Sequence, residues 1–107
     1  MEKPPELIFK AGYSESDDFE YEMKGYRNDV FVKMENGDLY EVFFYDPVRL
    51  TQDMGSGIYI SQPGLIILNS VNRKSMEHAV LELWERGFFH YFKPRLSIID
   101  KHFDENI

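Results

Sequence analysis

The feature that most constrains this fold is the Asn36-Gly37 pair, which lies between two runs rich in β-branched and aromatic residues. This dipeptide is the strongest short-range signal for a β-hairpin, so residues 29–45 are predicted to form two paired antiparallel strands. Three aromatic side chains fall on the second surface of this hairpin, where they need a cover or a partner: Phe31, Phe43 and Tyr45.

The hydrophobic pattern also predicts the register of the hairpin. A two-residue turn would pair Val32 with Glu41 and bring a carboxylate to the apolar face. A three-residue loop with Gly37 in the left-handed conformation instead pairs Val30 with Val42. We expect this second register, because a slip of one residue would bury the charge.

Alternation of apolar and charged residues predicts further strands. Residues 19–24 place Phe19, Tyr21 and Met23 on one side and charged residues on the other, which is typical of a half-buried strand. Residues 65–68 are apolar throughout, which favours a central position in the sheet. Additional strands are expected over residues 7–9 and 58–60, with one or two more after residue 88.

Capping residues predict two helices. Asp46 as N-cap, followed by Pro47, predicts a short helix that ends by Gly55. Two of its residues, four apart, are expected to face the core: Leu50 and Met54.

A longer helix is expected over about residues 73–86, with Asn72 as its N-cap and Gly87 in the left-handed position after its end. Apolar residues at helical spacing predict its buried stripe: Met76, Ala79, Val80, Leu83 and Trp84. The expected fold is α+β: an antiparallel sheet with one long helix from the C-terminal half packed on it and a second short helix. At 107 residues, the chain is predicted to be a single domain over residues 1–107.

Composition narrows the function classes. The absence of cysteine excludes disulfides, thiolate catalysis and zinc-thiolate sites. The start of the chain has neither a basic region nor a long apolar stretch, so we expect no secretory signal and a cytoplasmic location. The net charge of −7 disfavours nucleic acid and anionic membranes as partners and favours a basic protein.

The negative charge is concentrated near the start of the chain. Between Ala11 and Met23, five carboxylates occur without a basic residue. We interpret this run as a contact surface for a Lys- or Arg-rich protein; the alternative is a solvated surface that serves solubility alone. The predicted partner-binding residues include one aromatic anchor: Tyr13, Glu15, Asp17, Asp18, Glu20 and Glu22.

No catalytic motif stands out, and no cofactor is expected. The Gly55-Ser56-Gly57 sequence lacks the spacing of a nucleophile elbow. An enzyme is the least favoured class and would have to use His90 with a carboxylate such as Glu82 or Asp100. A metal site is a minor alternative at one place, where ligands alternate in the acidic tail: Asp100, His102 and Asp104.

A resemblance is carried by two passages, YEVFFYDPVRLTQDM and GLIILNSVNRKSMEHAVLELWERGFF, within about residues 39–89. They look like a group of small, uncharacterised bacterial proteins that share a D-P-x-R-L helix start and a helix ending in G-F/Y-F. In size, acidity and α+β character the chain is also similar to immunity proteins that neutralise polymorphic toxins. That resemblance implies a non-enzymatic inhibitor of a basic toxin and assigns no functional residue. The alternative is a small homo-oligomeric structural or ligand-binding protein.

Overall fold

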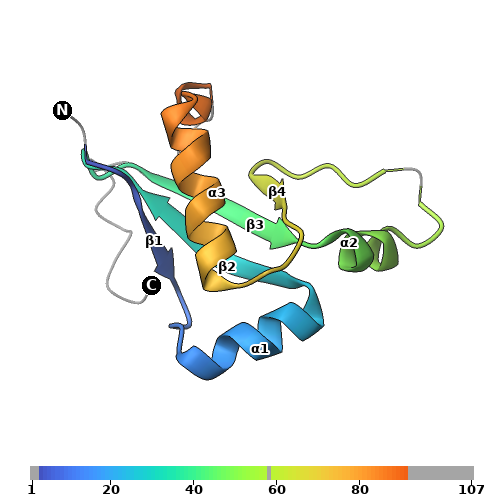
Figure 1. Cartoon of the computed structure of the whole chain (residues 1–107). Coiled ribbons are helices and arrows are strands. Elements are labelled where there is room, and N and C mark those ends of the chain that lie inside the picture. Colours follow the sequence, from blue (N-terminus) through green and yellow to red (C-terminus); the bar gives the residue numbers. More distant parts are fainter. Residues whose placement is uncertain (1–2, 58, 92–107) are drawn as a thin grey trace.

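The computed structural model describes residues 3–57 and 59–91, which form a four-stranded mixed sheet and three α-helices (Figure 1). In chain order the elements are β1 (Glu6–Phe9), α1 (Glu15–Lys24), β2 (Tyr26–Lys33), β3 (Leu39–Tyr45), α2 (Pro47–Met54), β4 (Leu65–Ile67), α3 (Arg73–Glu85) and the 3-10 turn η1 (Phe88–His90). The α+β class is confirmed. The prediction of a purely antiparallel sheet is wrong, because the sheet is mixed. Three α-helices form, in place of the one long helix and one short helix that were expected.

The hairpin has the register that the hydrophobic pattern predicts. Val30 pairs with Val42 and Val32 pairs with Tyr40, across a turn in which Gly37 has a φ of 94°. The turn is closed by a 2.9 Å bond from the Met34 amide to the Asp38 carbonyl. The predicted edge strand over residues 7–9 is also confirmed, since β1 pairs antiparallel with β2.

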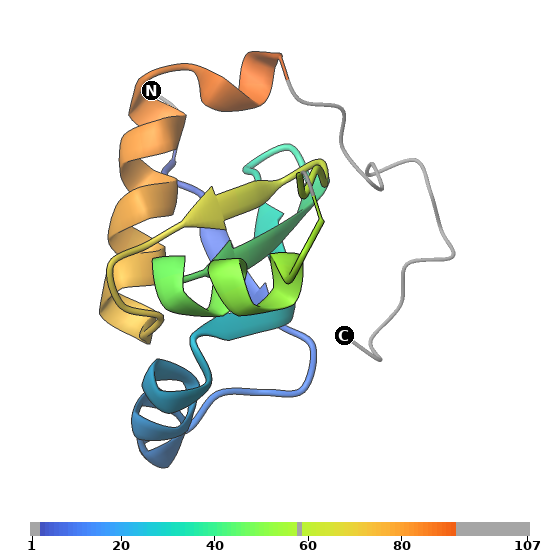
Figure 2. The ribbon, with the colours of Figure 1, turned by 90° about the vertical axis from the view of Figure 1, so that its right-hand side faces the viewer.

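The core lies between the sheet and α3, which crosses one face of it (Figure 1). The side-on view shows α3 along one side of the sheet, with α1 below its first turn (Figure 2). Asn72 caps α3 as expected, by accepting a 2.8 Å bond from the Ser75 amide. Met76 and Val80 of its apolar stripe are buried, and the other three residues predicted for the stripe pack against the core cluster while partly exposed.

The central position expected for residues 65–68 is wrong. β4 is an edge strand that runs parallel to β3, because α2 intervenes and returns the chain in the same direction. Hydrogen bonds from the Phe43 amide to the Gly64 carbonyl and from the Leu68 amide to the Tyr45 carbonyl fix its position. Ile66 is buried while Ile67 is 52% exposed, so this apolar run is covered on one side only.

The strand expected over residues 19–24 is also wrong, because this segment belongs to α1. The Asp17 carboxylate accepts a 2.8 Å bond from the Ser14 amide at the helix start, as in a capping box. Gly25, with a φ of 77°, ends the helix by donating its amide to the Tyr21 carbonyl at 2.8 Å. These end signals outweigh the alternating pattern between them.

Two smaller expectations fail in the described residues, and a third falls mostly outside them. The segment after Ile58 is not a strand at Tyr59, which is 76% exposed, and Ile58 itself lies outside the described residues. α2 begins and ends as predicted, but Leu50 and Met54 are only half-buried and lie outside the core cluster. The segment predicted as strand after residue 88 begins with η1, and residues 92–107 lie outside the described part.

The second surface of the sheet differs in its exposure from one residue to the next. Phe31 is 6% exposed, whereas Phe43 and Tyr45 are half-buried. Phe31 is therefore not accessible to the symmetry-related partner that an oligomeric role would place against it. Among the helices described, none is both long enough and apolar enough to cross a lipid bilayer.

Candidate protein-binding surface

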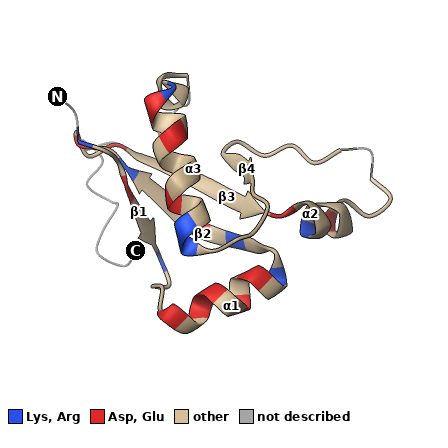
Figure 3. Cartoon of the chain, in the orientation of Figure 1, with Lys and Arg blue, Asp and Glu red and all other residues tan. Residues whose placement is uncertain are grey.

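The five carboxylates predicted to bind a partner all lie on α1, which is ten residues long. Lys24 is the only basic residue of the helix, so five carboxylates and one ammonium group leave a net charge of −4. The acidic character of α1 is evident beside the sheet strands (Figure 3). Acids in the first turn also favour the helix itself, because the amino-terminal end of the helix dipole is positive.

Only one of these carboxylates is paired with a basic side chain in the described residues. Glu20 forms a 2.9 Å ion pair with Lys24, with both side chains about half exposed. Asp17 serves the helix start, as described above, and Glu15 is exposed without a hydrogen bond or ion pair among the described residues. Four of the five carboxylates of α1 therefore form no ion pair with a basic side chain in the described residues.

The two remaining carboxylates attach α1 to the start of α3. Asp18 accepts a 2.9 Å bond from the Arg73 backbone amide and a second bond from the Tyr13 hydroxyl. Glu22 accepts a 2.9 Å bond from the Asn72 side-chain amide. The bonds from Tyr13 and Arg73 hold the pKa of Asp18 below its usual value. α1 is thus fixed in orientation although none of its residues is buried.

Tyr13, the predicted aromatic anchor, belongs to a cluster under α1. Its ring lies 4.7 Å from that of Phe9 and 6.0 Å from that of Tyr21. Burial, and then the bond to Asp18, raises the pKa of the Tyr13 hydroxyl above its ordinary value. The ring and the hydroxyl are therefore both engaged inside the molecule.

Arg27 forms the centre of this cluster and is 3% exposed. Its guanidinium carbon lies 4.4 Å from the Tyr21 ring centroid and 5.1 Å from that of Phe9. Nη2 donates a 2.8 Å bond to the Gly12 carbonyl, while Nη1 has no hydrogen-bond partner in the described part of the chain. The rings stabilise the buried cation through their faces rather than through a carboxylate.

Two apolar side chains are exposed on the outer side of α1. Phe19 is 71% exposed and Met23, one turn later, is 74% exposed. Residues four apart lie on the same face of a helix, so the two form a contiguous apolar site between the carboxylates. The predicted strand placed Phe19 and Met23 in the core, so their exposure was not expected. The Ser14-x-x-Asp17 sequence is the signal that would have predicted the helix.

The histidine chemistry considered from the sequence is not assembled with its suggested partner. His90 lines a cleft at the end of α3, but Glu82 contacts His78 at 3.5 Å and Arg86 at 2.7 Å instead. Asp100, like the rest of the alternating acidic tail, lies outside the described residues. Within residues 3–57 and 59–91 there is no group of three or more side chains placed to hold a metal ion.

Comparisons with protein-family models, with curated proteins and with solved structures gave no match to this chain. The resemblance to small bacterial proteins and to immunity proteins therefore stays a prediction.

Proposed function

We propose that this chain is a non-enzymatic protein-binding module that docks a basic protein through α1. The observation that supports this most directly is the combination on one short helix of a net charge of −4 with two exposed apolar side chains. An acidic surface raises the association rate with a cationic partner and disfavours other partners. It contributes less to the lifetime of the complex than apolar burial does.

Phe19 and Met23 supply the apolar part of the proposed interface. Each side chain contributes about 1.5–3 kcal/mol when it is fully removed from water. Glu15 and Glu20 lie beside this pair as charged rim residues. An apolar centre with a charged rim is the usual arrangement in specific protein interfaces.

The attachment of α1 to α3 supports the same proposal. Asp18 and Glu22 accept hydrogen bonds from uncharged donors, so they hold the helix in place while keeping their negative charge. A binding helix that is already oriented loses less conformational entropy when a partner docks. The tyrosine predicted as an anchor, Tyr13, acts in this proposal by positioning Asp18.

More specifically, we propose that the chain is an immunity-type inhibitor that binds a basic toxin in the cytoplasm. An acidic helix fits the positive cleft of an enzyme that acts on an anionic substrate, and it would exclude that substrate. The acidity of the chain and its resemblance to immunity proteins favour this reading over a general adaptor role.

The experiment compares capture of partners by two charge-matched double variants of the full chain. Glu15→Gln with Glu20→Gln removes two charges from α1, and Glu77→Gln with Glu82→Gln removes two from α3. In the α3 pair, as at Glu20, each carboxylate belongs to an exposed ion pair four residues apart, so the change in fold stability is small for both variants.

We expect a protein from the source organism to bind the wild type and the α3 variant but not the α1 variant. A third variant, Phe19→Ser with Met23→Ser, should release the same protein without a change in net charge. If the captured protein is an enzyme, the wild-type chain should inhibit it. Equal capture by all variants, or no capture at low salt, would contradict the proposal.

A further inference from the structure

The second surface of the sheet, on the side away from α3, carries apolar side chains around one carboxylate. Side chains alternate between the two sides of a strand, so the observed register shows which residues share this surface. Glu41 lies among the apolar residues and is opposite Phe31 on the neighbouring strand. Six apolar side chains lie on this surface: Ile8, Phe31, Leu39, Phe43, Tyr45 and Leu65.

Two of these side chains are buried although they lie outside the core between the sheet and α3. Phe31 and Leu39 are each 6% exposed, and neither belongs to the core cluster. Among the helices of residues 3–57 and 59–91, none lies against this surface. Figure 2 shows α3 on the other side of the sheet, and Figure 1 shows α1 and α2 beyond the ends of the strands. The cover of Phe31 and Leu39 is therefore not one of these helices.

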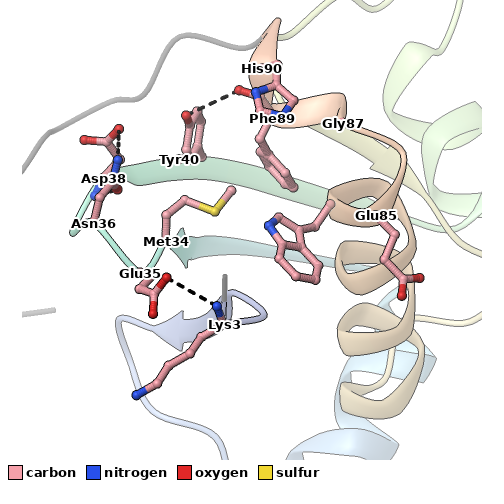
Figure 4. A pocket seen from close by; sticks show the side chains of 11 residues that line it. Lys3, Met34, Glu35, Asn36, Asp38, Tyr40, Glu85, Gly87, Phe89 and His90 are labelled. Carbon is pink, nitrogen blue, oxygen red and sulfur yellow. Dashed lines mark hydrogen bonds between the residues drawn. The ribbon is translucent and has the colours of Figure 1, made fainter. Parts of the chain in front are cut away.

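The last described residues lie close to this surface. The Tyr40 hydroxyl donates a 3.3 Å bond to the Phe89 carbonyl, which holds η1 beside the start of β3 (Figure 4). Leu39 and Glu41, on either side of Tyr40, belong to the second surface. In Figure 2, η1 extends from α3 across the end of the sheet toward that surface.

The next eight residues of the sequence, 92–99, are long enough to cross the sheet. An extended residue spans about 3.3 Å, so the segment reaches about 25 Å, whereas neighbouring strands are only about 5 Å apart. The segment contains no acidic residue, although the net charge of the chain is −7. Its apolar residues are Phe92, Leu96, Ile98 and Ile99, and its basic residues are Lys93 and Arg95.

We infer that residues 92–99 bind the second surface of the sheet of the same molecule. Their apolar side chains match Phe31 and Leu39, and their positive charges match Glu41. A second copy of the chain fits less well, because a two-fold contact through this surface would bring two copies of Glu41 into one interface. The segment thus excludes a homo-oligomer that uses this surface. The inference is independent of the proposed function of α1.

A spin label tests this contact in the full chain. The chain has no cysteine, so Ser97→Cys provides a single attachment site for a nitroxide. In a nitrogen-15-labelled sample, the nitroxide should strongly broaden the amide signals of Phe31, Glu41 and Phe43, and broaden that of Val80 on α3 much less. A mixture of spin-labelled chains and separate nitrogen-15-labelled chains should show no broadening, because the contact lies within one molecule.

Two double variants test the energetic contribution of the segment. Ile98→Ser with Ile99→Ser should lower the urea midpoint by at least about 1 M, because two apolar side chains lose their burial. The matched control is Phe19→Ser with Met23→Ser, at positions that are 71% and 74% exposed. Its midpoint should fall by no more than about 0.3 M.

Four results would overturn the inference. Equal urea midpoints of the two double variants, or equal broadening on the second surface and on α3, would show that the segment does not bind there. Broadening confined to the cleft that Trp84 and His90 line would place the segment at the end of α3 instead. Broadening in the mixed sample would assign the surface to a second copy. Failure of α1 to bind a partner would leave the inference unaffected.

Discussion

Replacing Asp18 with alanine is expected to lower the free energy of unfolding by about 2 kcal/mol at pH 7. The carboxylate accepts two hydrogen bonds, one from the Arg73 amide at 2.9 Å and one from the Tyr13 hydroxyl. Hydrogen bonds to charged groups contribute about 1.5–3 kcal/mol each, and we take about 1 kcal/mol each because Asp18 is partly exposed to water. No residue of α1 is buried, so no loss of core packing adds to this value.

The stabilisation that Asp18 provides should be lost in acid. The native structure holds the pKa of Asp18 below the ordinary value of 3.8, chiefly through the Tyr13 hydroxyl and the Arg73 amide. The stabilisation is therefore complete well above pH 3.8 and is lost as the pH falls through the lower, native pKa. The difference in stability between wild type and Asp18→Ala should be constant near neutrality and should shrink in acid.

Urea unfolding followed by Trp84 fluorescence measures this difference, and the midpoint should fall by on the order of 1 M. The matched control is Glu15→Ala, on the same helix but exposed and without a hydrogen bond among the described residues. Its stability should remain within about 0.5 kcal/mol of wild type. Equal effects of the two substitutions, or a gap that widens in acid, would refute the assigned role of Asp18.

Two further predictions concern the backbone and the core. Gly25→Ala should lower the free energy of unfolding by at least about 2 kcal/mol in thermal melts, because φ is 77° and a Cβ would lie 2.8 Å from Cβ of Arg49. Gly12→Ala, at a φ of 80° but with open space around the added Cβ, should lower it by about half as much in the same melts. Met76→Ala, at a fully buried position, should cost about 3 kcal/mol in urea unfolding, and a loss below 1 kcal/mol would contradict its place in the core.

The candidate interface was only partly predictable. The five carboxylates were identified as a cluster, and the structure places them on a single helix. The exposure of Phe19 and Met23 was not predicted, because alternation over six residues has the same appearance as one face of a strand. The cleft was not predicted either, since its lining comes from the amino terminus, the hairpin and the end of α3.

β4 shows what could not be predicted about the sheet from the sequence. Residues 65–68 show that a strand is favoured, but their composition carries no information about which strand they pair with or in which direction. The direction follows from the path through α2, which returns the chain parallel to β3 at the sheet edge. The buried Arg27 is a similar case, because the rings that surround it come from β1, the following turn and α1.

Short-range chemistry in the sequence alone determined the hairpin register, the starts of α2 and α3 and the apolar stripe of α3. These features depend on residues within a few positions of one another, such as Asn36 and Gly37 or Asp46 and Pro47. Only the tertiary structure decided the pairing of β4, the docking of α1 onto α3 and the burial of Arg27. Each of those depends on contacts between residues distant along the chain, whose free energy becomes available only when the whole core forms.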